Sequence, residues 1–411
     1  MNSLKDENND IKKQKLLPVI YQSLGRISVQ VLGFFLGVLI VRYSGLDLFG
    51  EYAKYNALIN ISFGVFASGI YSNYLRSNNI KLLWDSLAGT TYLLVFFLVF
   101  IYPIYTFLFE ESYFNIMLIL LGVYFMRLCE LYIISIRFIE QDAKAILPRA
   151  IPYLILITLF LIFKPDDITS LLLMFVIAWM TIVFYVLSLK GYFVVQKLNI
   201  KLLLSSTFLL SINTLGTQIT GNFDQLMISG LLGDTQLGVY KIGLSFAFLV
   251  MPVITVFSFI YLSKLKEKLQ NDSVQLIKKS FYSQIGINLC AGLIFLIFYS
   301  IFLVDIIDFI YGLNDENAYY AGVILAIGVL FNVIAIVFSY TFLAVKKDKE
   351  VLFITLIGAT TNIVLNYFFI TSYGILGAAW ASVITQFLML VLYMYIFYFK
   401  MDSFNSLKKL I

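Results

Sequence analysis

Polar and charged side chains recur every three or four residues inside two long apolar stretches, so that each set would lie along one face of a helix. The first stripe comprises Gln22, Arg26, Gln30, Gly33 and Gly37, and the second comprises Asn213, Thr217, Thr220 and Asp224. Amides and hydroxyls can hydrogen-bond neutral polar groups, and a guanidinium fork matches phosphate oxygens. The stripes therefore indicate a polar binding surface, with hydrogen bonding and close packing between helices as the alternative.

Further ionisable residues lie within apolar stretches, where each costs roughly 2.5–3.5 kcal/mol at the centre of a membrane helix and so needs a partner, water or a function. Arg127 and Glu130 are spaced to pair on one helix face, whereas Arg42 and Lys54 could instead extend to the membrane interface. Cations outnumber anions, which suits an anionic cargo. The candidate substrate-binding residues are Gln22, Arg26, Gln30, Lys54, Arg127, Asn213 and Lys241, and the candidates for ion or proton coupling are Asp224 and Glu130.

The composition identifies an integral membrane protein and narrows its chemistry. Of 411 residues, 61% are hydrophobic and 13% charged, and the mean hydropathy is +0.90. A soluble domain carries about 25% charged residues. The chain has no histidine, and both cysteines (Cys129 and Cys290) lie in apolar stretches. We therefore expect no catalytic triad based on histidine, no metal site and no cofactor.

A membrane helix needs about 20 mainly apolar residues, and this length divides the chain into twelve expected spans. They are Leu16–Tyr43, Gly50–Leu75, Trp84–Phe109, Tyr113–Ile136, Ala145–Phe163, Ile168–Leu189, Leu202–Leu231, Leu237–Leu262, Phe281–Ile301, Tyr320–Val345, Val351–Thr371 and Ile375–Phe399. The expected fold is all-α, with twelve transmembrane helices in two six-helix bundles around a central cavity.

The distribution of Lys and Arg orients these spans. Both tails and alternate loops, together with Arg149 at the start of the fifth span, hold 23 of the 29 basic residues, whereas the other loops hold only Lys164. By the positive-inside rule, both termini are expected in the cytoplasm. The expected parts are a tail (1–15), an N-terminal bundle (16–195), a linker (196–201), a C-terminal bundle (202–399) and a second tail (400–411).

The two halves share a short motif. Gly45, Gly50 and Tyr52 follow the pattern G-x4-G-x-Y, and Gly233, Gly238 and Tyr240 repeat it, in each case between the odd and even helices of a pair. Because six helices separate the copies, both turns are expected on the same, outer side. Such a repeat is typical of alternating-access transporters.

Several segments, taken in order along the chain, resemble the polysaccharide flippases of the multidrug, oligosaccharidyl-lipid and polysaccharide exporter superfamily. They are Gly25–Arg26, Arg42–Tyr52, Phe223–Gly230, Gly238–Tyr240, Asn362–Asn366 and Gly374–Ala379. The resemblance is to the O-antigen and capsular repeat-unit (Wzx-type) branch. It implies two six-helix bundles that move an undecaprenyl-pyrophosphate-linked oligosaccharide across the bacterial inner membrane, with Arg26 and Lys241 as cationic lumen residues.

This interpretation gives a transporter and not an enzyme. Its expected partners are the lipid-linked oligosaccharide, membrane lipids, and a polysaccharide polymerase with its chain-length machinery; no nucleic acid is expected. The first alternative is a multidrug exporter of the same superfamily, which would favour an anionic, aromatic-rich cavity. The second is a membrane-embedded polysaccharide polymerase, which would need a catalytic site, usually on a sizeable loop, and no outer loop here is long enough.

Overall fold

The described part of the protein is helical throughout its regular elements. The computed structural model describes residues 25, 27–62, 112, 114–126, 147–188, 200–271, 273–345 and 347–400. Four helices in these ranges are long and apolar enough to cross a membrane, and a bent helix pair would make a fifth. The described helices agree with the all-α membrane class expected from the sequence, and the number twelve stays a prediction.

The chain divides into two compact units, and the first comprises residues 1–36 and 79–198. Its described helices are Phe114–Met126, α5 (Leu147–Phe163) and α6 (Ile168–Ser188). Phe175 stacks on Trp179 with ring centroids 4.1 Å apart. The Thr169 hydroxyl donates to the Asn115 side-chain oxygen at 2.8 Å. The Thr169–Asn115 hydrogen bond joins α6 to the helix before α5, whereas the Phe175–Trp179 contact lies within α6.

Asp167 caps the N-terminus of α6, because its Oδ2 accepts the backbone N–H of Ser170 at 2.8 Å. Hydrogen bonds from Ser170 hold the pKa of this carboxyl below its usual value. Its stabilising effect is therefore complete above about pH 4, the ordinary pKa of Asp, and is lost as the pH falls through the lowered value.

We expect Asp167→Ala to lower stability at neutral pH by about 0.5–2 kcal/mol, the usual worth of an N-cap. Asp167→Asn can still accept the Ser170 N–H, so it should lose much less. Thermal unfolding of the purified protein in detergent, followed by loss of the monomer peak, measures both variants. Equal losses would show that the charge, and not the cap, provides the stabilisation.

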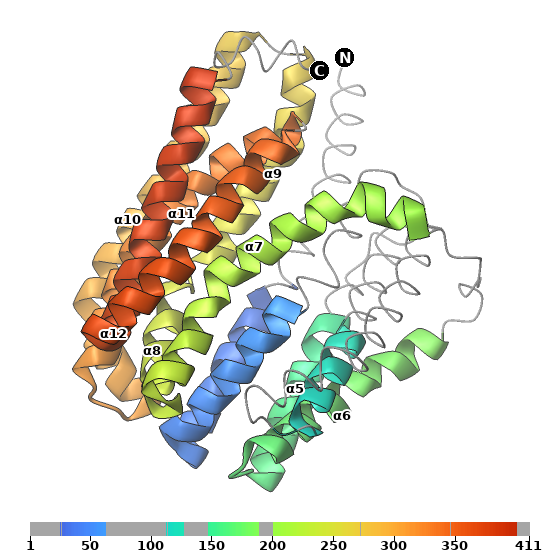
Figure 1. Ribbon diagram of the computed structural model, residues 1–411, viewed down its shortest axis with the longest axis vertical. Helices are drawn as coiled ribbons and strands as arrows, with labels where there is room; N and C mark the ends of the chain where they lie inside the picture. The colour runs from blue at the N-terminus through green and yellow to red at the C-terminus, as the bar shows by residue number, and fades with distance from the viewer. Residues whose placement is uncertain are drawn as a thin grey trace, which may run out of the picture. The chain divides into compact units, whose positions relative to one another are not determined.

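The second unit comprises residues 37–78 and 199–411, and all its labelled helices lie after the middle of the chain. They are α7 (Ile200–Leu232), α8 (Asp234–Ala247), α9 (Met251–Asn271), α10 (Val274–Tyr311), α11 (Glu316–Ala344) and α12 (Asp348–Tyr395), followed by a π-helical turn (Ile396–Lys400). Helix α11 packs against α8, α9, α10 and α12, whereas α7 packs against α12 and α8 (Figure 1).

Three glycines allow the chain to reverse direction with almost no loop. Gly45 and Gly233 both have φ +92°, and Gly374, inside α12, has φ +62°. A residue with a side chain rarely adopts these angles, whereas glycine does so freely. The helical segment Ile27–Ser62 turns at Gly45 (blue in Figure 1). Gly374 likewise divides α12 into the two spans expected from the sequence.

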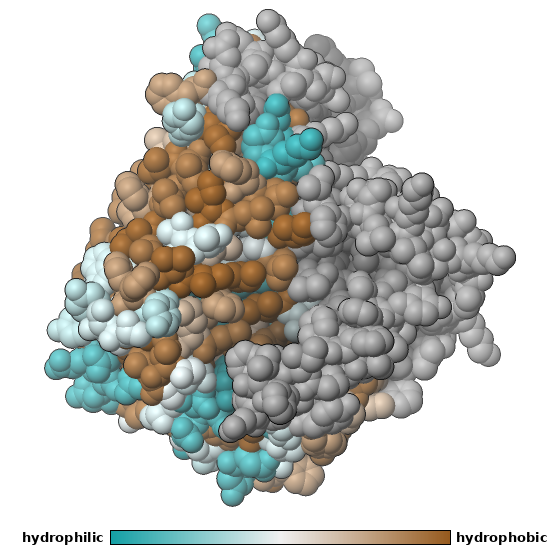
Figure 2. Space-filling model, in the orientation of Figure 1, coloured by the Kyte–Doolittle hydropathy of each residue, from teal (hydrophilic) through white to brown (hydrophobic). Residues whose placement is uncertain are grey.

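The surface of this unit is apolar where a soluble protein would be polar. Large apolar side chains on α10, α12 and the π-helical turn are exposed, which would be unfavourable in water; among them are Ile294, Phe309, Phe353 and Phe399. Figure 2 shows apolar side chains across the middle of the visible face, with hydrophilic groups toward its ends. Inside, Phe281 stacks on Phe397 with centroids 5.0 Å apart. Both patterns fit a bundle surrounded by lipid.

Candidate functional site

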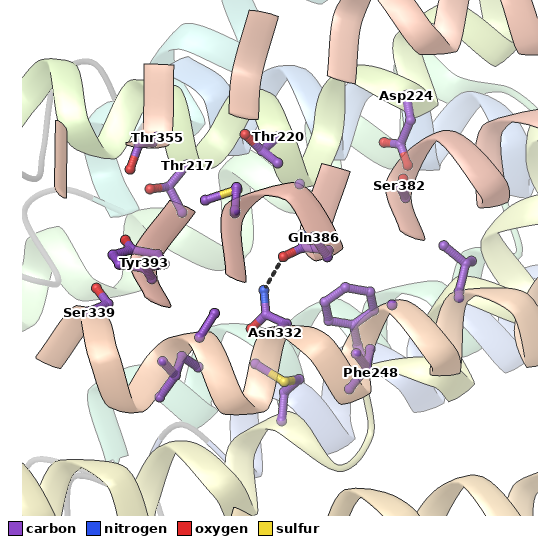
Figure 3. A pocket seen from close by; sticks show the side chains of 18 of the residues that line it. Thr217, Thr220, Asp224, Phe248, Asn332, Ser339, Thr355, Ser382, Gln386 and Tyr393 are labelled. Carbon is purple, nitrogen blue, oxygen red and sulfur yellow. Dashed lines mark hydrogen bonds between the residues drawn. The ribbon is translucent and has the colours of Figure 1, made fainter. Parts of the chain in front are cut away.

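A cavity of about 360 Å³, with both polar and apolar groups in its walls, lies inside the second unit. Helices α7, α8, α9, α11 and α12 contribute its walls, and Leu244, Phe248, Met251 and Val329 supply apolar surface. Its polar lining consists of hydroxyls, carboxamides and one carboxylate, from Asn213, Thr217, Thr220, Asp224, Asn332, Ser339, Thr355, Ser382, Gln386 and Tyr393. Figure 3 labels all of these side chains except Asn213 around the cavity. So many polar groups are costly in an apolar bundle unless they serve a ligand or water.

The α7 wall is the polar stripe identified in the sequence, since all four of its members line the cavity. The hydroxyls of Thr217 and Thr220 donate to the carbonyls four residues earlier, at 3.0 and 2.8 Å. Their hydrogens are thereby used, and their oxygen lone pairs stay available as acceptors. The Asn213 Oδ1 atom is buried without a hydrogen-bond partner. This wall thus offers acceptors to a ligand that carries O–H or N–H groups.

The carboxylate of Asp224 is already bound within the protein. Only 2% of this residue is exposed; its Oδ2 accepts the Tyr240 hydroxyl at 2.5 Å and its Oδ1 accepts the Gln225 N–H at 2.8 Å. The ammonium of Lys241 donates to Gln225 Oε1 at 3.0 Å and adds a positive charge close to the carboxylate. The structure therefore surrounds the negative charge of Asp224 with donors and a cation.

The opposite wall contains a carboxamide pair that the sequence analysis did not single out. Asn332 on α11 donates through Nδ2 to Gln386 Oε1 on α12 at 2.8 Å, drawn as the dashed line in Figure 3. Each is an isolated amide within an apolar span, and that isolation was the available signal. Facing the α7 stripe, the pair completes a cavity with polar groups on two sides.

The predicted site residues fall in different places. Asn213 and Asp224 line the cavity, whereas the described lining does not include Lys241. Lys54 forms an ion pair with Asp234 (Nζ to Oδ2, 3.3 Å) near the Gly233 turn. Gln30 is half-buried. It lies before Gly45 in the helical segment Ile27–Ser62, in the part that belongs to the first unit. The remaining candidates, Gln22, Arg26, Arg127 and Glu130, lie outside the described residues.

Two other predicted features have clear structural partners. Arg42, which could have extended to the interface, instead donates to the carbonyls of Phe309 and Ile310 at 2.6 and 2.7 Å. Asn362 and Asn366 are fully buried, and Asn366 donates to the Asn362 side-chain oxygen at 3.0 Å. This bond lies within α12, and Asn362 Nδ2 and Asn366 Oδ1 are buried without a hydrogen-bond partner.

The fold is similar to that of several solved transporters of the MOP superfamily. A multidrug resistance MATE family transporter in an inward-facing conformation superposes with a TM-score of 0.70 at 14% identity, covering 95% of this chain and 99% of that one. The lipid II flippase MurJ, in an inward closed conformation, gives 0.68 at 17%, covering 95% and 91%. A MOP superfamily transporter from Pyrococcus furiosus, described as having a binding pocket of reversed polarity, gives 0.65 at 13%, covering 97% and 96%.

The sequence similarity to a known family is confined to one part of the chain. The MatE family model matches residues 210–368, which include most of α7, all of α8 to α11 and the first part of α12. The search of curated proteins gave no match. The shared fold is therefore established over nearly the whole chain, and the family similarity over less than half of it.

Proposed function

We propose that the protein is a MOP-type transporter that flips a lipid-linked oligosaccharide, of the undecaprenyl-pyrophosphate repeat-unit kind, across the bacterial inner membrane. The proposal rests on the cavity of the second unit, whose polar lining is almost entirely uncharged. Hydroxyl acceptors on α7 and carboxamides on α11 and α12 complement the hydroxyls of a neutral sugar. Its one carboxylate, Asp224, is engaged by Tyr240 and lies near Lys241.

The same observation separates this proposal from its main alternative. A multidrug exporter that takes organic cations needs an available negative charge, and aromatic residues such as Phe248 and Tyr393, which line the same cavity, could contact such a cation. A cation would have to compete with the Tyr240 hydroxyl and with the positive charge of Lys241. A ligand that is neutral at this position meets neither obstacle, and similarity to MurJ supports a lipid-linked cargo.

The charged part of the cargo calls for other residues. We propose that Arg26 and Arg127 contact the pyrophosphate, with Gln22 and Gln30 beside Arg26, and that Asp224 and Glu130 are the coupling candidates. In this proposal, both termini lie in the cytoplasm, and a polysaccharide polymerase with its chain-length machinery uses the product. Cargo recognition would then combine a cationic region for phosphate with a neutral polar region for sugar.

The decisive test removes the carboxamide pair. In cells that lack the gene, lipid-linked saccharide should accumulate in the inner leaflet, and the parent protein should clear it. Asn332→Leu with Gln386→Leu should insert normally and reduce clearance at least tenfold. Ile294→Ala, at a position that is 69% exposed on the lipid-facing surface, is the matched control and should clear like the parent.

Ethidium efflux from the same cells decides between the two candidates. The proposal expects efflux to be unchanged by deletion or by either variant. Normal distribution of lipid-linked saccharide in the deletion strain, together with lost ethidium efflux, would overturn the flippase and establish the multidrug exporter.

A further inference from the structure

The two G-x4-G-x-Y turns contact each other as equivalent partners. Gly45 and Gly233 share φ +92°, and the Thr235 hydroxyl donates to Asp47 Oδ1 at 2.8 Å. Asp47 and Thr235 are 188 residues apart, which is also the offset between the two glycines. Equivalent positions of the two repeats therefore face each other, as residues do across the axis of a symmetric dimer.

The contact is reciprocal and excludes side chains. A Cβ atom at Gly50 would lie 1.7 Å from the carbonyl oxygen of Asp234, and one at Gly238 would lie 2.4 Å from the carbonyl oxygen of Leu46. Leu46 and Asp234 are again equivalent residues of the repeat. In both directions a glycine meets backbone, which cannot move aside as a flexible side chain could. Each turn thus needs glycine where the other approaches.

Polar contacts surround this glycine interface. Lys54 pairs with Asp234 at 3.3 Å, with the two side chains 17% and 20% exposed. Arg42 donates to the last carbonyls of α10 at Phe309 and Ile310, where a cation complements the helix dipole. Deeper, the Asn60 amide donates to Asn222 Oδ1 at 3.1 Å. These bonds attach residues 37–62 of the first half to the second half.

We infer that these two turns form a reversible clasp that closes the transport pathway on the predicted outer side. The glycine faces can separate without disengaging interlocked side chains. The groups released are Asp47, Thr235, Lys54 and Asp234, all of which water can solvate. Partly exposed ion pairs of this kind contribute little to stability. The close fit of the two glycine turns, more than the strength of the polar contacts around them, therefore determines how the closed state is formed.

The inference rests on the proposed transport function but not on the identity of the cargo. It requires that the clasp open during each cycle and that both glycines be needed to close it. A purely static interface would also exclude side chains, but it would not need to open. The tests below separate these two roles.

The first test locks the clasp. In a background carrying Cys129→Ala and Cys290→Ala, Asp47→Cys and Thr235→Cys are oxidised to a disulfide, and tagging with a maleimide polymer counts the remaining free thiols. The clasp predicts that oxidation stops export of either candidate cargo and that reduction restores it. Continued export by protein whose two thiols are fully oxidised would overturn the inference.

The second test needs no cargo. Gly50→Ala and Gly238→Ala should each slow disulfide formation at least tenfold and to similar extents. Gly221→Ala and Gly230→Ala are matched controls on α7, because nothing lies within 4 Å of a Cβ at either position. They should react at the parent rate. Parent-like rates in the Gly50→Ala and Gly238→Ala proteins would overturn the glycine requirement.

The third test measures opening of the clasp by the accessibility of position 49. Phe49 is only 2% exposed. In a cysteine-free background, a Phe49→Cys thiol should react slowly with an impermeant reagent added outside the cell, since the clasp opens only part of the time. Adding Gly238→Ala should raise the rate at least fivefold, whereas Gly221→Ala should not. A thiol that stays unreactive in all three proteins would show a static contact and overturn the clasp.

If labelling behaves as expected while lipid-linked saccharide is distributed normally in the deletion strain, the clasp stands and the proposed cargo fails.

Discussion

Gly243→Ala is expected to lose most of its folded protein. A Cβ at this position would lie 2.6 Å from the carbonyl oxygen of Ala318 and 2.7 Å from the backbone nitrogen of Gly322. Both contacts are with the backbone of α11, so α8 would have to move away. Tyr299 also donates to the Gly243 carbonyl at 3.1 Å, and this movement would strain that bond. Overpacking a tight interior costs about 1–3 kcal/mol or more, and a backbone contact this close belongs at the upper end.

Gly286→Ala provides the control, because nothing lies within 4 Å of its Cβ position. Alanine favours a helix over glycine by about 1 kcal/mol, so this variant should be as stable as the parent or slightly more so. The yield of monodisperse protein in detergent and its thermal midpoint measure both. Equal midpoints for the two variants would show that α8 and α11 can separate at little cost.

Asp224→Leu is the second variant with a large expected effect. It removes the acceptor of the fully buried Tyr240 hydroxyl and takes a negative charge away from the neighbourhood of Lys241. Leaving a buried hydrogen-bond donor unpaired costs about 1–3 kcal/mol. Removing the opposite charge beside a buried ion costs about 3–5 kcal/mol. We expect a marked loss of thermal stability in detergent. Asp224→Asn, which keeps an acceptor oxygen, should lose much less.

A double-mutant cycle tests the reason for this loss. Adding Tyr240→Phe to Asp224→Leu removes the unpaired hydroxyl and should recover part of the stability, whereas Tyr240→Phe alone should be mildly destabilising. The coupling between the two positions should be clearly different from zero. Additive effects would mean that the short contact contributes nothing beyond packing.

Helices were predictable from the sequence wherever apolar length alone defines them. Leu202–Leu231 corresponds to α7 (Ile200–Leu232), and Ile168–Leu189 corresponds to α6 (Ile168–Ser188). The span expected at Leu237–Leu262 is instead bent by 44° between α8 and α9. Pro252 follows the break, and the residue before a proline disfavours the helical conformation. Hydropathy averages over such a bend and does not reveal it.

The site was only partly predictable, for a related reason. The α7 stripe is visible in one segment because helical periodicity places its members on one face. Asn332 and Gln386 are 54 residues apart in sequence and lie on different helices. Periodicity within one helix cannot indicate that they form a pair. The partner of Lys54 is Asp234, 180 residues away. Such contacts follow from how helices pack, which the repeat suggested only at the glycine turns.

Helix α10 has a consequence for how far the protein extends beyond the membrane. Its 38 residues correspond to about 57 Å at 1.5 Å per residue, whereas the hydrocarbon layer is only about 30 Å thick. Even a tilt of about 40°, the upper end for membrane helices, leaves about 44 Å along the membrane normal. We therefore expect the first turns, with exposed Lys278 and Lys279, to reach the lipid headgroups on the predicted cytoplasmic side. There the two lysines are expected to attract anionic phospholipids. The fraction of anionic lipid in the bilayer would then affect how firmly this end of α10 is held at the membrane surface.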